Sequence, residues 1–312
     1  MRIAIVGIGD IAEKAYLPIL TQLPGVALVF CTRNKMTLQR LAAQYRIKEC
    51  YQDYRQLNQA NIDAVMIHSS TAVHPEIAAY FLQQGLPTFV DKPLADNGSD
   101  CEQLYELAQK RQVPLYMGFN RRFIPLYQLH FGALQETNPD ALLSLRWEKN
   151  RHNLAGDIRN FIFDDFIHPL DSVNLCAKNT LQDVHLSCQF KGSQLARLDL
   201  QWQNGNTLLH ASMNRLYGIT CERVSANFEN RAYEFDSFTT GKLLENKQTS
   251  IIQLEDWTPM LTAKGFAGMI NDWIGVIQAG KLKQSVIERN LSSHQLAEAV
   301  CQKVQGMLVN NR

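Results

Sequence analysis

The stretch Arg2-Ile-Ala-Ile-Val-Gly-Ile-Gly-Asp-Ile-Ala12 decides the fold of this chain. Its residues 3–6 are all apolar, which predicts a short strand buried on both faces. The turn that follows has the spacing G-x-G-x-x-A, in which Gly7 allows the tight turn and Gly9 lets a pyrophosphate approach the backbone. Ala12 is small enough for the next helix to pack on the strand, and the N-terminus of that helix favours an anion. A dinucleotide site is therefore a better interpretation than an ordinary strand-to-helix turn, with contacts from Gly7, Ile8, Gly9, Asp10 and Ile11.

Length, charge and cysteine usage exclude several classes of protein. A chain of 312 residues is usual for two domains, and its net charge of +1 gives no bulk attraction to nucleic acid or to an anionic membrane. No apolar run is long enough to cross a bilayer, and the glycines after residue 6 make the first stretch a poor signal peptide. The seven cysteines are scattered without a C-x-x-C spacing. They predict reduced thiols in the cytoplasm, and neither a disulfide framework nor a metal site.

Strands and helices alternate through the first part of the chain. Apolar runs predict further strands at residues 26–32, 64–67, 88–90 and 113–117. Between these strands, apolar residues recur at helical spacing over residues 38–45, 77–82 and 101–108. The alternation predicts a doubly wound parallel sheet, which is a Rossmann dinucleotide-binding domain over residues 1–122.

The periodicity changes in the second part of the chain. Apolar and polar residues alternate over residues 197–202, which predicts a strand with one wet face, and Asn204-Gly205 after it is a strong hairpin signal. Folding the chain there predicts two apolar pairs across the hairpin, Leu200 with Leu209 and Leu198 with Ala211.

Other strands complete a second sheet. They are predicted at residues 142–147, 184–190, 219–226 and 231–235. An apolar stripe at helical spacing over residues 266–277 predicts a helix that covers one face of this sheet. We therefore expect residues 123–312 to form an α+β domain for substrate binding and oligomerisation, with an open, largely antiparallel sheet. The uncovered face is polar, so it either stays solvated or is the surface of a homodimer or larger homo-oligomer.

The end of the predicted second strand is unusually basic. Ligands of doubly wound folds bind at the carboxyl ends of the strands, and an NAD site places an acidic residue there for the ribose hydroxyls. No acidic residue occurs between Glu13 and Glu49, and the segment instead contains the cations Arg33, Lys35 and Arg40. Lys35 and Arg40 also suit a solvated helix start. We predict that Thr32 and Arg33 bind the 2′-phosphate of NADP(H), with NAD(H) as the alternative cofactor.

A run of hydroxyl and imidazole side chains follows the strand predicted at residues 64–67. The hydroxyl groups either bind ribose and phosphate oxygens or cap the helix that follows. We predict cofactor contacts from Ser69, Ser70, Thr71 and His74. His68 ends an apolar strand, and we interpret it as structural.

Lys92 lies at the mouth of the next buried strand, directly before Pro93. A solvated lysine is oddly placed there, so we interpret it as a functional cation. The alternative is a surface ion pair with Asp91 or Asp96.

Asp164 and His168 form a candidate acid–base pair in the second domain. If their segment is helical, the two side chains lie one turn apart on the same face, and Pro169 interrupts the helix beside the histidine. A carboxylate that orients an imidazole is a recurring general-base device, although a capped helix start is an equal alternative. A serine hydrolase is disfavoured, because no G-x-S-x-G elbow is present.

Together these motifs resemble the Gfo/Idh/MocA oxidoreductases, the family of glucose–fructose oxidoreductase and inositol dehydrogenase. The similarity covers the glycine turn, residues 63–74, Asp91-Lys92-Pro93 where the family has Glu-Lys-Pro, residues 118–123, and Asp164…His168-Pro-Leu-Asp171. Asp-Lys-Pro and the Asp164-Asp165 doublet are most similar to the virulence-factor-type MviM branch. The resemblance implies hydride transfer with NAD(P), with Lys92, Asp164 and His168 as the catalytic group. It also implies a cofactor contact from Arg122, substrate contacts from Asn120 and the catalytic residues, and pairing of subunits through the second sheet.

The substrate is harder to predict than the reaction. The glycines that the family has before the aspartate are replaced by Arg159-Asn160-Phe161, so the wall of the site differs. Lys149, Arg151 and Asn153 lie in a segment without acidic residues, which we expect to be a loop that either binds an acidic sugar-like substrate or is simply solvated. We predict an oxidoreductase that transfers a hydride between NADP(H) and a polyhydroxylated small molecule. The alternative is a dinucleotide-sensing regulator without turnover, which would need none of the three catalytic residues.

Overall fold

The structure, a computed structural model, describes residues 1–132 and 141–310. The chain divides by its contacts into two compact units. The first comprises Met1–Phe119 and Phe266–Ile287, and the second comprises Asn120–Gly265 and Glu288–Arg312. The first break lies close to the predicted boundary after Arg122. The predicted division is wrong for one segment, because Phe266–Ile287 belongs to the first unit.

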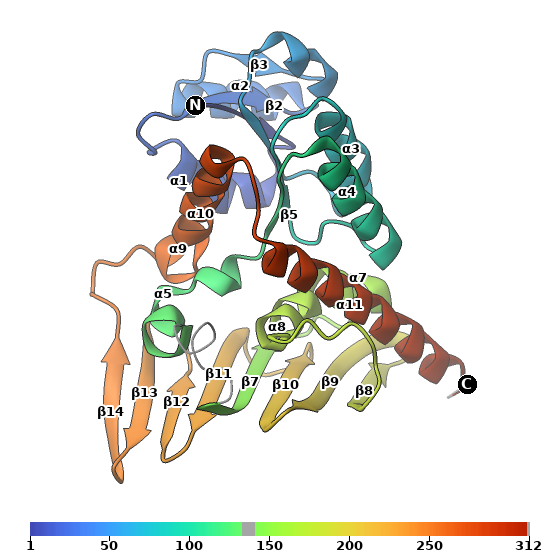
Figure 1. Cartoon of the computed structure of the whole chain (residues 1–312), viewed down its shortest axis with the longest axis vertical. Helices are drawn as coiled ribbons and strands as arrows, with labels where there is room; N and C mark the ends of the chain where they lie inside the picture. The colour runs from blue at the N-terminus through green and yellow to red at the C-terminus, as the bar shows by residue number, and fades with distance from the viewer. Residues whose placement is uncertain (133–140, 311–312) are drawn as a thin grey trace. The chain divides into compact units, whose positions relative to one another are not determined.

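The first unit contains the predicted parallel sheet, with strand order β3-β2-β1-β4-β5-β6 (Figure 1). Its strands are β1 (Arg2–Val6), β2 (Ala27–Cys31), β3 (Cys50–Tyr51), β4 (Ala64–Ile67), β5 (Thr88–Asp91) and β6 (Leu115–Gly118). Every neighbouring pair is parallel. The apolar runs become strands because helices cover both faces of such a sheet, so each residue of β4 is buried. The strand order reverses between β1 and β4, where doubly wound sheets bind their ligands.

The helices that connect these strands follow the predicted apolar spacing. They are η1 (Ala12–Tyr16) with α1 (Leu17–Leu20), α2 (Lys35–Tyr45), η2 (Tyr54–Gln59), η3 (Thr71–Val73) with α3 (His74–Gln83), and α4 (Gly98–Arg111). In α3 the apolar residues Ile77, Ala78, Phe81 and Leu82 are buried, as predicted. Asn34 begins α2 by accepting a hydrogen bond from the backbone N–H of Thr37.

The helix α10 (Phe266–Ala279) packs within the first unit. The ring of Trp273 lies 5.9 Å from that of Phe89 on β5 and 5.5 Å from that of Tyr116 on β6. The hydroxyl of Tyr116 also donates to the carboxylate of Asp272 at 2.8 Å. The predicted helix is therefore confirmed, but the prediction that it covers the second sheet is wrong. Its apolar stripe shows that one face is buried and does not show against which sheet.

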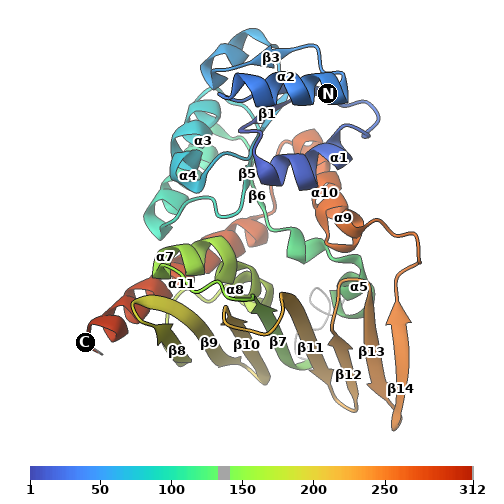
Figure 2. The same ribbon diagram turned by 180° about the vertical axis from the view of Figure 1, so that it is seen from behind.

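The second unit is built on an eight-stranded sheet, with strand order β14-β13-β12-β11-β7-β10-β9-β8 (Figure 2). Its strands are β7 (Leu142–Asn150), β8 (Val184–Lys191), β9 (Gln194–Asn204), β10 (Thr207–Asn214), β11 (Cys221–Phe228), β12 (Arg231–Phe235), β13 (Thr240–Glu245) and β14 (Gln248–Gln253). Only β7 and β10 pair in parallel among them. The largely antiparallel sheet is thus confirmed, and β13 and β14 extend it beyond the predicted strands.

The hairpin between β9 and β10 has a different register from the predicted one. Leu209 lies opposite Trp202 and Ala211 lies opposite Leu200, which is a shift of two residues. The shift arises because Asn204 pairs with Thr207, so two residues form the loop, of which the first is Gly205 with φ of +55°. Since side chains alternate with period two, the predicted apolar face is nevertheless the buried one.

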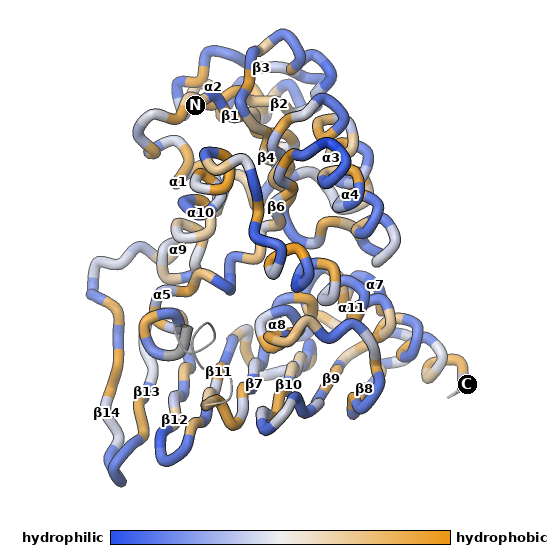
Figure 3. Tube along the Cα trace, viewed as in Figure 1, coloured by the Kyte–Doolittle hydropathy of each residue, from blue (hydrophilic) through white to orange (hydrophobic). Residues whose placement is uncertain are grey.

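Helices cover one face of the second sheet. They are α7 (Ile158–Asn160), η7 (Phe161–Phe166), α8 (Ile167–Val173) and the long α11 (Gln284–Asn310), and Figure 1 shows α8 and α11 over the strands. Hydrophobic and hydrophilic residues alternate along β8 and β9 (Figure 3). The wet face carries a hollow of about 440 Å³ lined by His185, Ser187, Cys188, Gln189, Arg197, Asp199, Gln201 and His210.

Among the described residues, no helix combines the length and the apolar character that crossing a bilayer requires.

Short helical segments complete the second unit. They are η4 (Asn120–Phe123), α5 (Pro125–Tyr127) with η5 (Gln128–Gly132), and α9 (Met260–Ala263). Asn120 is buried, and its side-chain amide donates to the carbonyl oxygen of Lys264 at 2.8 Å. Gly265 after it has φ of +84°, and a Cβ there would lie 2.1 Å from the carbonyl oxygen of Asn120. These contacts tie the two chain segments that enter and leave this unit.

Candidate active site

A cleft of about 620 Å³ lies at the carboxyl ends of β1, β2 and β4. Its lining includes the predicted cofactor residues Gly7, Ile8, Gly9, Thr32, Arg33, Ser69 and Ser70. The predicted residues Asp10, Ile11, Thr71 and His74 are not part of the lining. Asp10 instead forms an exposed ion pair with Lys14 at 2.7 Å. The three strand ends therefore lie together, as the topology of a doubly wound sheet requires.

The two glycines of the turn differ in the space around their α-carbons. Gly7 has φ of +81°, and a Cβ there would lie 2.5 Å from the backbone nitrogen of Ser69. Only glycine fits this position, because the turn and the loop after β4 are in contact. At Gly9 a Cβ would meet no atom within 4 Å. The backbone of Gly9 is consequently open toward a ligand, as the motif predicts.

The basic residues after β2 have different environments. Both terminal nitrogens of Arg40 bind the carboxylate of Glu13, at 2.8 and 2.7 Å. Arg40 is therefore engaged in an ion pair on the protein surface. Arg33, in contrast, lines the cleft, and its guanidinium makes no ion pair within residues 1–132 and 141–310. Of Arg33, Lys35 and Arg40, it is the one that lines the cleft.

The segment after β3 contributes cleft residues that the sequence analysis did not identify. They are Gln52, Asp53, Tyr54 and Arg55, together with Glu76 from α3. Arg55 is held by Glu76 at 2.9 Å, by Asp53 at 3.6 Å, and over the ring of Tyr54. A two-residue strand such as β3 has too few residues to show periodicity, so the sequence carried no strand signal here. Asp53 also brings a carboxylate into a cleft whose second strand end has none.

Two histidines beside this cleft are buried. The ring of His68 lies 4.0 Å from that of Tyr16, and desolvation lowers the pKa of His68 to about 3. His74 bridges two loops, because its Nδ1 lies 2.9 Å from the carbonyl oxygen of Pro93 and its Nε2 lies 2.8 Å from that of Ser69. The structure therefore gives His74 partners in the protein, and any effect on the cofactor is through the loop that it holds.

Lys92 follows β5 at the same edge of the sheet, before the cis peptide bond to Pro93. Its neighbour Asp91 is buried and accepts a hydrogen bond from the hydroxyl of Tyr16 at 2.7 Å. Burial raises the pKa of Asp91, although Lys92 and the Tyr16 hydrogen bond partly offset this effect. Lys92 therefore follows directly on the end of β5, which the hydrogen bond between Asp91 and Tyr16 fixes to η1.

The segment with Asp164 and His168 is helical, which is the condition for the predicted pair, and it changes from a π-helix to an α-helix between the two residues. The π-helix η7 ends at Phe166, and α8 continues through Pro169, which lacks the N–H that a regular helix would use. His168 is buried, with 5% of its surface exposed, whereas Asp164 is exposed.

Asp165, the second member of the aspartate doublet, is the centre of a buried ionic cluster. Arg151 binds it with two nitrogens at 3.0 and 2.9 Å, Arg215 binds it at 3.1 Å, and Lys149 forms an ion pair with it. We call these four residues the Asp165 cluster. Burial alone would raise the pKa of Asp165, but Lys149 and Arg151 together hold it below its ordinary value. The structure corrects the sequence analysis for Lys149, which is a buried residue of β7 and not part of a loop.

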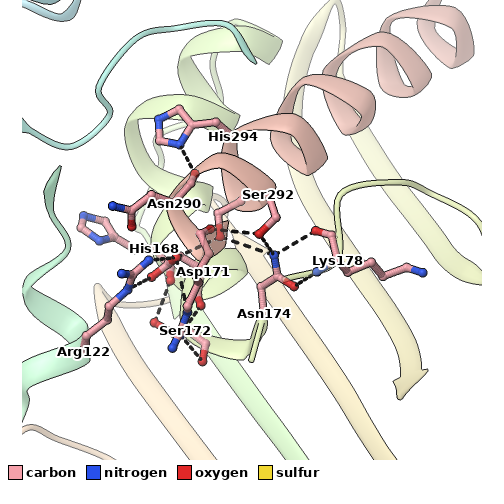
Figure 4. Close-up of polar contacts among 11 residues, drawn as sticks. Arg122, His168, Asp171, Ser172, Asn174, Lys178, Asn290, Ser292 and His294 are labelled. Carbon is pink, nitrogen blue, oxygen red and sulfur yellow. Dashed lines mark hydrogen bonds and ion pairs between the residues drawn. The ribbon is translucent and has the colours of Figure 1, made fainter. Parts of the chain in front are cut away.

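A second buried cluster surrounds Asp171 on α8 (Figure 4). Arg122 donates two hydrogen bonds to its carboxylate at 2.9 and 2.6 Å, and the hydroxyl of Ser293 donates a third at 2.9 Å. Arg289 donates to the carbonyl oxygen of Asp171 at 2.6 Å. The predicted cofactor residue Arg122 therefore anchors η4 to α8 and α11. Its position links the histidine helix to the start of this unit.

Known proteins match this chain over most of its length. Residues 1–119 match a family described as an oxidoreductase family with an NAD-binding Rossmann fold. A crystal structure of a Gfo/Idh/MocA family oxidoreductase from Vibrio cholerae is 57% identical, covers 99% of both chains and has a TM-score of 0.97. The chain belongs to the Gfo/Idh/MocA family.

Two other relatives match along nearly their whole length, and one of them is an MviM dehydrogenase, in agreement with the resemblance to that branch. An MviM dehydrogenase from Clostridium difficile is 27% identical, with a TM-score of 0.81, over 100% of this chain and 98% of that one. YceM of Salmonella typhimurium, an oxidoreductase by its name, is 30% identical over 96% of this chain and 97% of that protein. Family membership makes the chain an NAD(P)-dependent oxidoreductase whose first unit is the NAD-binding Rossmann fold.

Proposed function

We propose that this oxidoreductase prefers NADP(H) and acts on a polyhydroxylated small molecule. The observation that carries the preference is Arg33, a cation without an ion-pair partner among the described residues that lines the cleft after β2. A charge-assisted contact to the 2′-phosphate is worth about 1.5–3 kcal/mol, which is about tenfold or more in affinity. Asp53 in the same cleft is the residue that would favour the ribose hydroxyls of NAD(H).

The cleft suits a dinucleotide in size and in backbone shape. Its volume of about 620 Å³ is that of a small-molecule site, and the open side of Gly9 leaves space for a pyrophosphate. We propose that the turn from Gly7 to Ile11 holds the pyrophosphate and that Thr32 with Arg33 holds the adenosine phosphate. Ser69 and Ser70 would bind the next ribose. The bound nicotinamide supplies the hydride acceptor or donor.

We propose His168 as the general acid–base, with Asp164 and Lys92 assisting it. When an alcohol is oxidised, its C–H hydrogen leaves as a hydride and its O–H proton must pass to a base. The unperturbed pKa of histidine, about 6.5, suits this transfer near neutral pH, and that of lysine, about 10.4, suits a fixed cation that polarises the oxygen. Lys92 as the base is the alternative mechanism, and it would leave His168 as an orienting group.

We also propose a homodimer formed through the wet face of the second sheet, and a cytoplasmic location. The helices of the second unit cover the opposite face of the sheet (Figure 2). The polar hollow at β8, β9 and β10 is available to a partner. All seven cysteines are free, which suits a reducing compartment.

One screen tests the proposed function. The purified protein would be mixed with NADP⁺ or NAD⁺ and with a panel of sugars, inositols and sugar acids, while nicotinamide absorbance is followed. We expect turnover with NADP⁺ for at least one polyol, and loss of that turnover in His168→Ala. Tight NADPH binding without turnover on any member of the panel would instead favour a dinucleotide sensor.

A further inference from the structure

The Asp165 cluster contains more positive than negative charge. Its single carboxylate is the ion-pair partner of Lys149, Arg151 and Arg215, so the two arginines alone outnumber the anion, and Lys149 adds positive charge when it is protonated. The nearby Glu222 is already engaged, because Arg121 binds it at 2.5 Å and the indole N–H of Trp147 donates to it at 3.2 Å. Glu222 is therefore paired with Arg121 and does not cancel the surplus.

Burial makes this surplus costly. Lys149 and Arg215 are 2% and 4% exposed, and desolvation lowers the pKa of Lys149 to about 7. The Nε atom of Arg215 is buried and has no hydrogen-bond partner in the described part of the chain. Buried cations are stabilised only when anions or other acceptors satisfy them. An additional anion near the cluster would therefore stabilise these buried cations.

Arg151 is the member of the cluster that a ligand can reach. Its side chain is 33% exposed, whereas that of Asp165 is 5% exposed. Its Nε and Nη2 atoms bind Asp165, and Nη1 makes no hydrogen bond to the described residues. The guanidinium is therefore held by one edge and offers its remaining N–H groups, in a geometry that suits carboxylates and phosphates.

Arg151 is also joined, through Asp165, to the helical segment that carries the candidate catalytic residues Asp164 and His168. The pKa of Arg151 is raised, mainly by its hydrogen bonds to Asp165 and in part by the charge of Asp164. Asp164 and Asp165 are adjacent, and His168 follows three residues after Asp165 on the same helical segment.

We infer that Arg151 binds an anionic group of the substrate, a carboxylate or a phosphate, and that Asp165 with Lys149 and Arg215 holds its guanidinium in place. The inference rests on the proposed function, because it makes the polyhydroxylated substrate an acid or a phosphate ester. A neutral polyol would leave the surplus charge of the cluster unpaired.

Matched ligand pairs test this inference without turnover. Cofactor-free protein would be titrated by calorimetry or ligand-observed NMR with glucose, gluconate and glucose 6-phosphate at constant ionic strength. We expect at least one charged ligand to bind about tenfold or more tightly than glucose, as for one charge-assisted contact. Gluconate would identify a carboxylate, and glucose 6-phosphate a phosphate; preference for either one supports the inference.

Variants assign the preference to Arg151. Arg151→Ala should abolish it, and Arg151→Lys should keep part of it, because lysine retains the charge without the fork. Arg146→Ala is the matched control, since Arg146 lies on β7, which ends one residue before Arg151, and its exposed guanidinium forms an ion pair with Glu148. Equal binding of glucose and the charged ligands by the wild type would overturn the inference, as would an undiminished preference in a folded Arg151→Ala protein.

Two further measurements keep the outcomes distinct. If Arg151→Ala does not fold, the Arg151→Lys variant decides, because Asp165 keeps three cationic partners in that variant. An unchanged preference for the charged ligand in Arg151→Lys contradicts recognition by the arginine fork. NADPH binding is titrated separately on the same preparations. A wild-type protein that binds NADPH but shows no preference for the charged ligands refutes this inference alone, whereas a wild-type protein that does not bind NADPH refutes the proposed function.

Discussion

The two glycines of the first turn should respond in opposite ways to the same substitution. A methyl group at Gly7 would lie 2.5–2.8 Å from three atoms of Ser69, two of them backbone, and the residue has φ of +81°. A side chain at such a positive φ costs about 1–2 kcal/mol before any steric shift. We therefore expect Gly7→Ala to lower the free energy of unfolding by about 2 kcal/mol or more.

Gly9→Ala should leave stability almost unchanged and still impair cofactor binding. A Cβ at Gly9 meets no protein atom within 4 Å, so the change in stability should stay within about 0.5 kcal/mol. The added methyl group occupies the space through which a pyrophosphate approaches the backbone. We expect NADPH affinity to fall about tenfold or more.

The two variants are compared by urea unfolding of the cofactor-free proteins and by fluorescence titration with NADPH. Gly306→Ala, in an exposed part of α11, is the control, and it should gain about 0.5–1 kcal/mol without a change in affinity. Wild-type affinity in Gly9→Ala would show that the dinucleotide does not cross this turn. Wild-type stability in Gly7→Ala would refute the argument from its contact with Ser69.

Four other predictions use simpler readouts. His168→Ala should lower turnover by about 10²–10⁴ with intact folding and NADPH affinity, and near-normal turnover would exclude it as the base. Arg33→Ala should remove the preference for NADPH over NADH in paired titrations; an unchanged ratio would contradict its phosphate role. Burial lowers the pKa of Lys149 to about 7, whereas an unfolded lysine titrates near 10.5. Between these pH values the unfolded state binds more protons than the folded state, so the free energy of unfolding rises with pH. The urea midpoint of Lys149→Met should therefore rise less with pH over this range than that of the wild type. Light scattering should give a dimer mass or larger, and a monomer at micromolar concentration would end the idea of pairing through the sheet.

Most of the first sheet could be predicted because its signals are local. A strand buried on both faces is an apolar run, and β1 and β4 lie where such runs occur. The glycine turn is also a local feature, since its conformation depends on consecutive residues. β3 was not predicted, because two residues carry no periodicity and their partner strand is distant in sequence.

Partner choice was less predictable than element type. The stripe on α10 predicts a helix with one buried face, but Phe89 and Trp273, which pack together, are far apart in the chain. The hairpin register was wrong by two residues, because the pair Asn204-Gly205 marks a turn without specifying which residues close it. The face that is buried was still correct, since a shift of two preserves the alternation.

The Asp164-Asp165 doublet shows why the substrate side of the site could not be assigned from sequence. Two adjacent aspartates have the same chemistry, and only their surroundings distinguish them. Asp165 is buried among cations from β7 and from the segment after β10, which lie about 15 and 50 residues away in sequence. Those cations keep it ionised, and because its oxygens are occupied it is unsuited to exchanging protons. Asp164 remains exposed, one residue away, and is the carboxylate that the proposed mechanism can use. The doublet thus combines a fixed charge that holds Arg151 with an exposed carboxylate four residues before the candidate base. This division of roles follows from opposite environments of like groups.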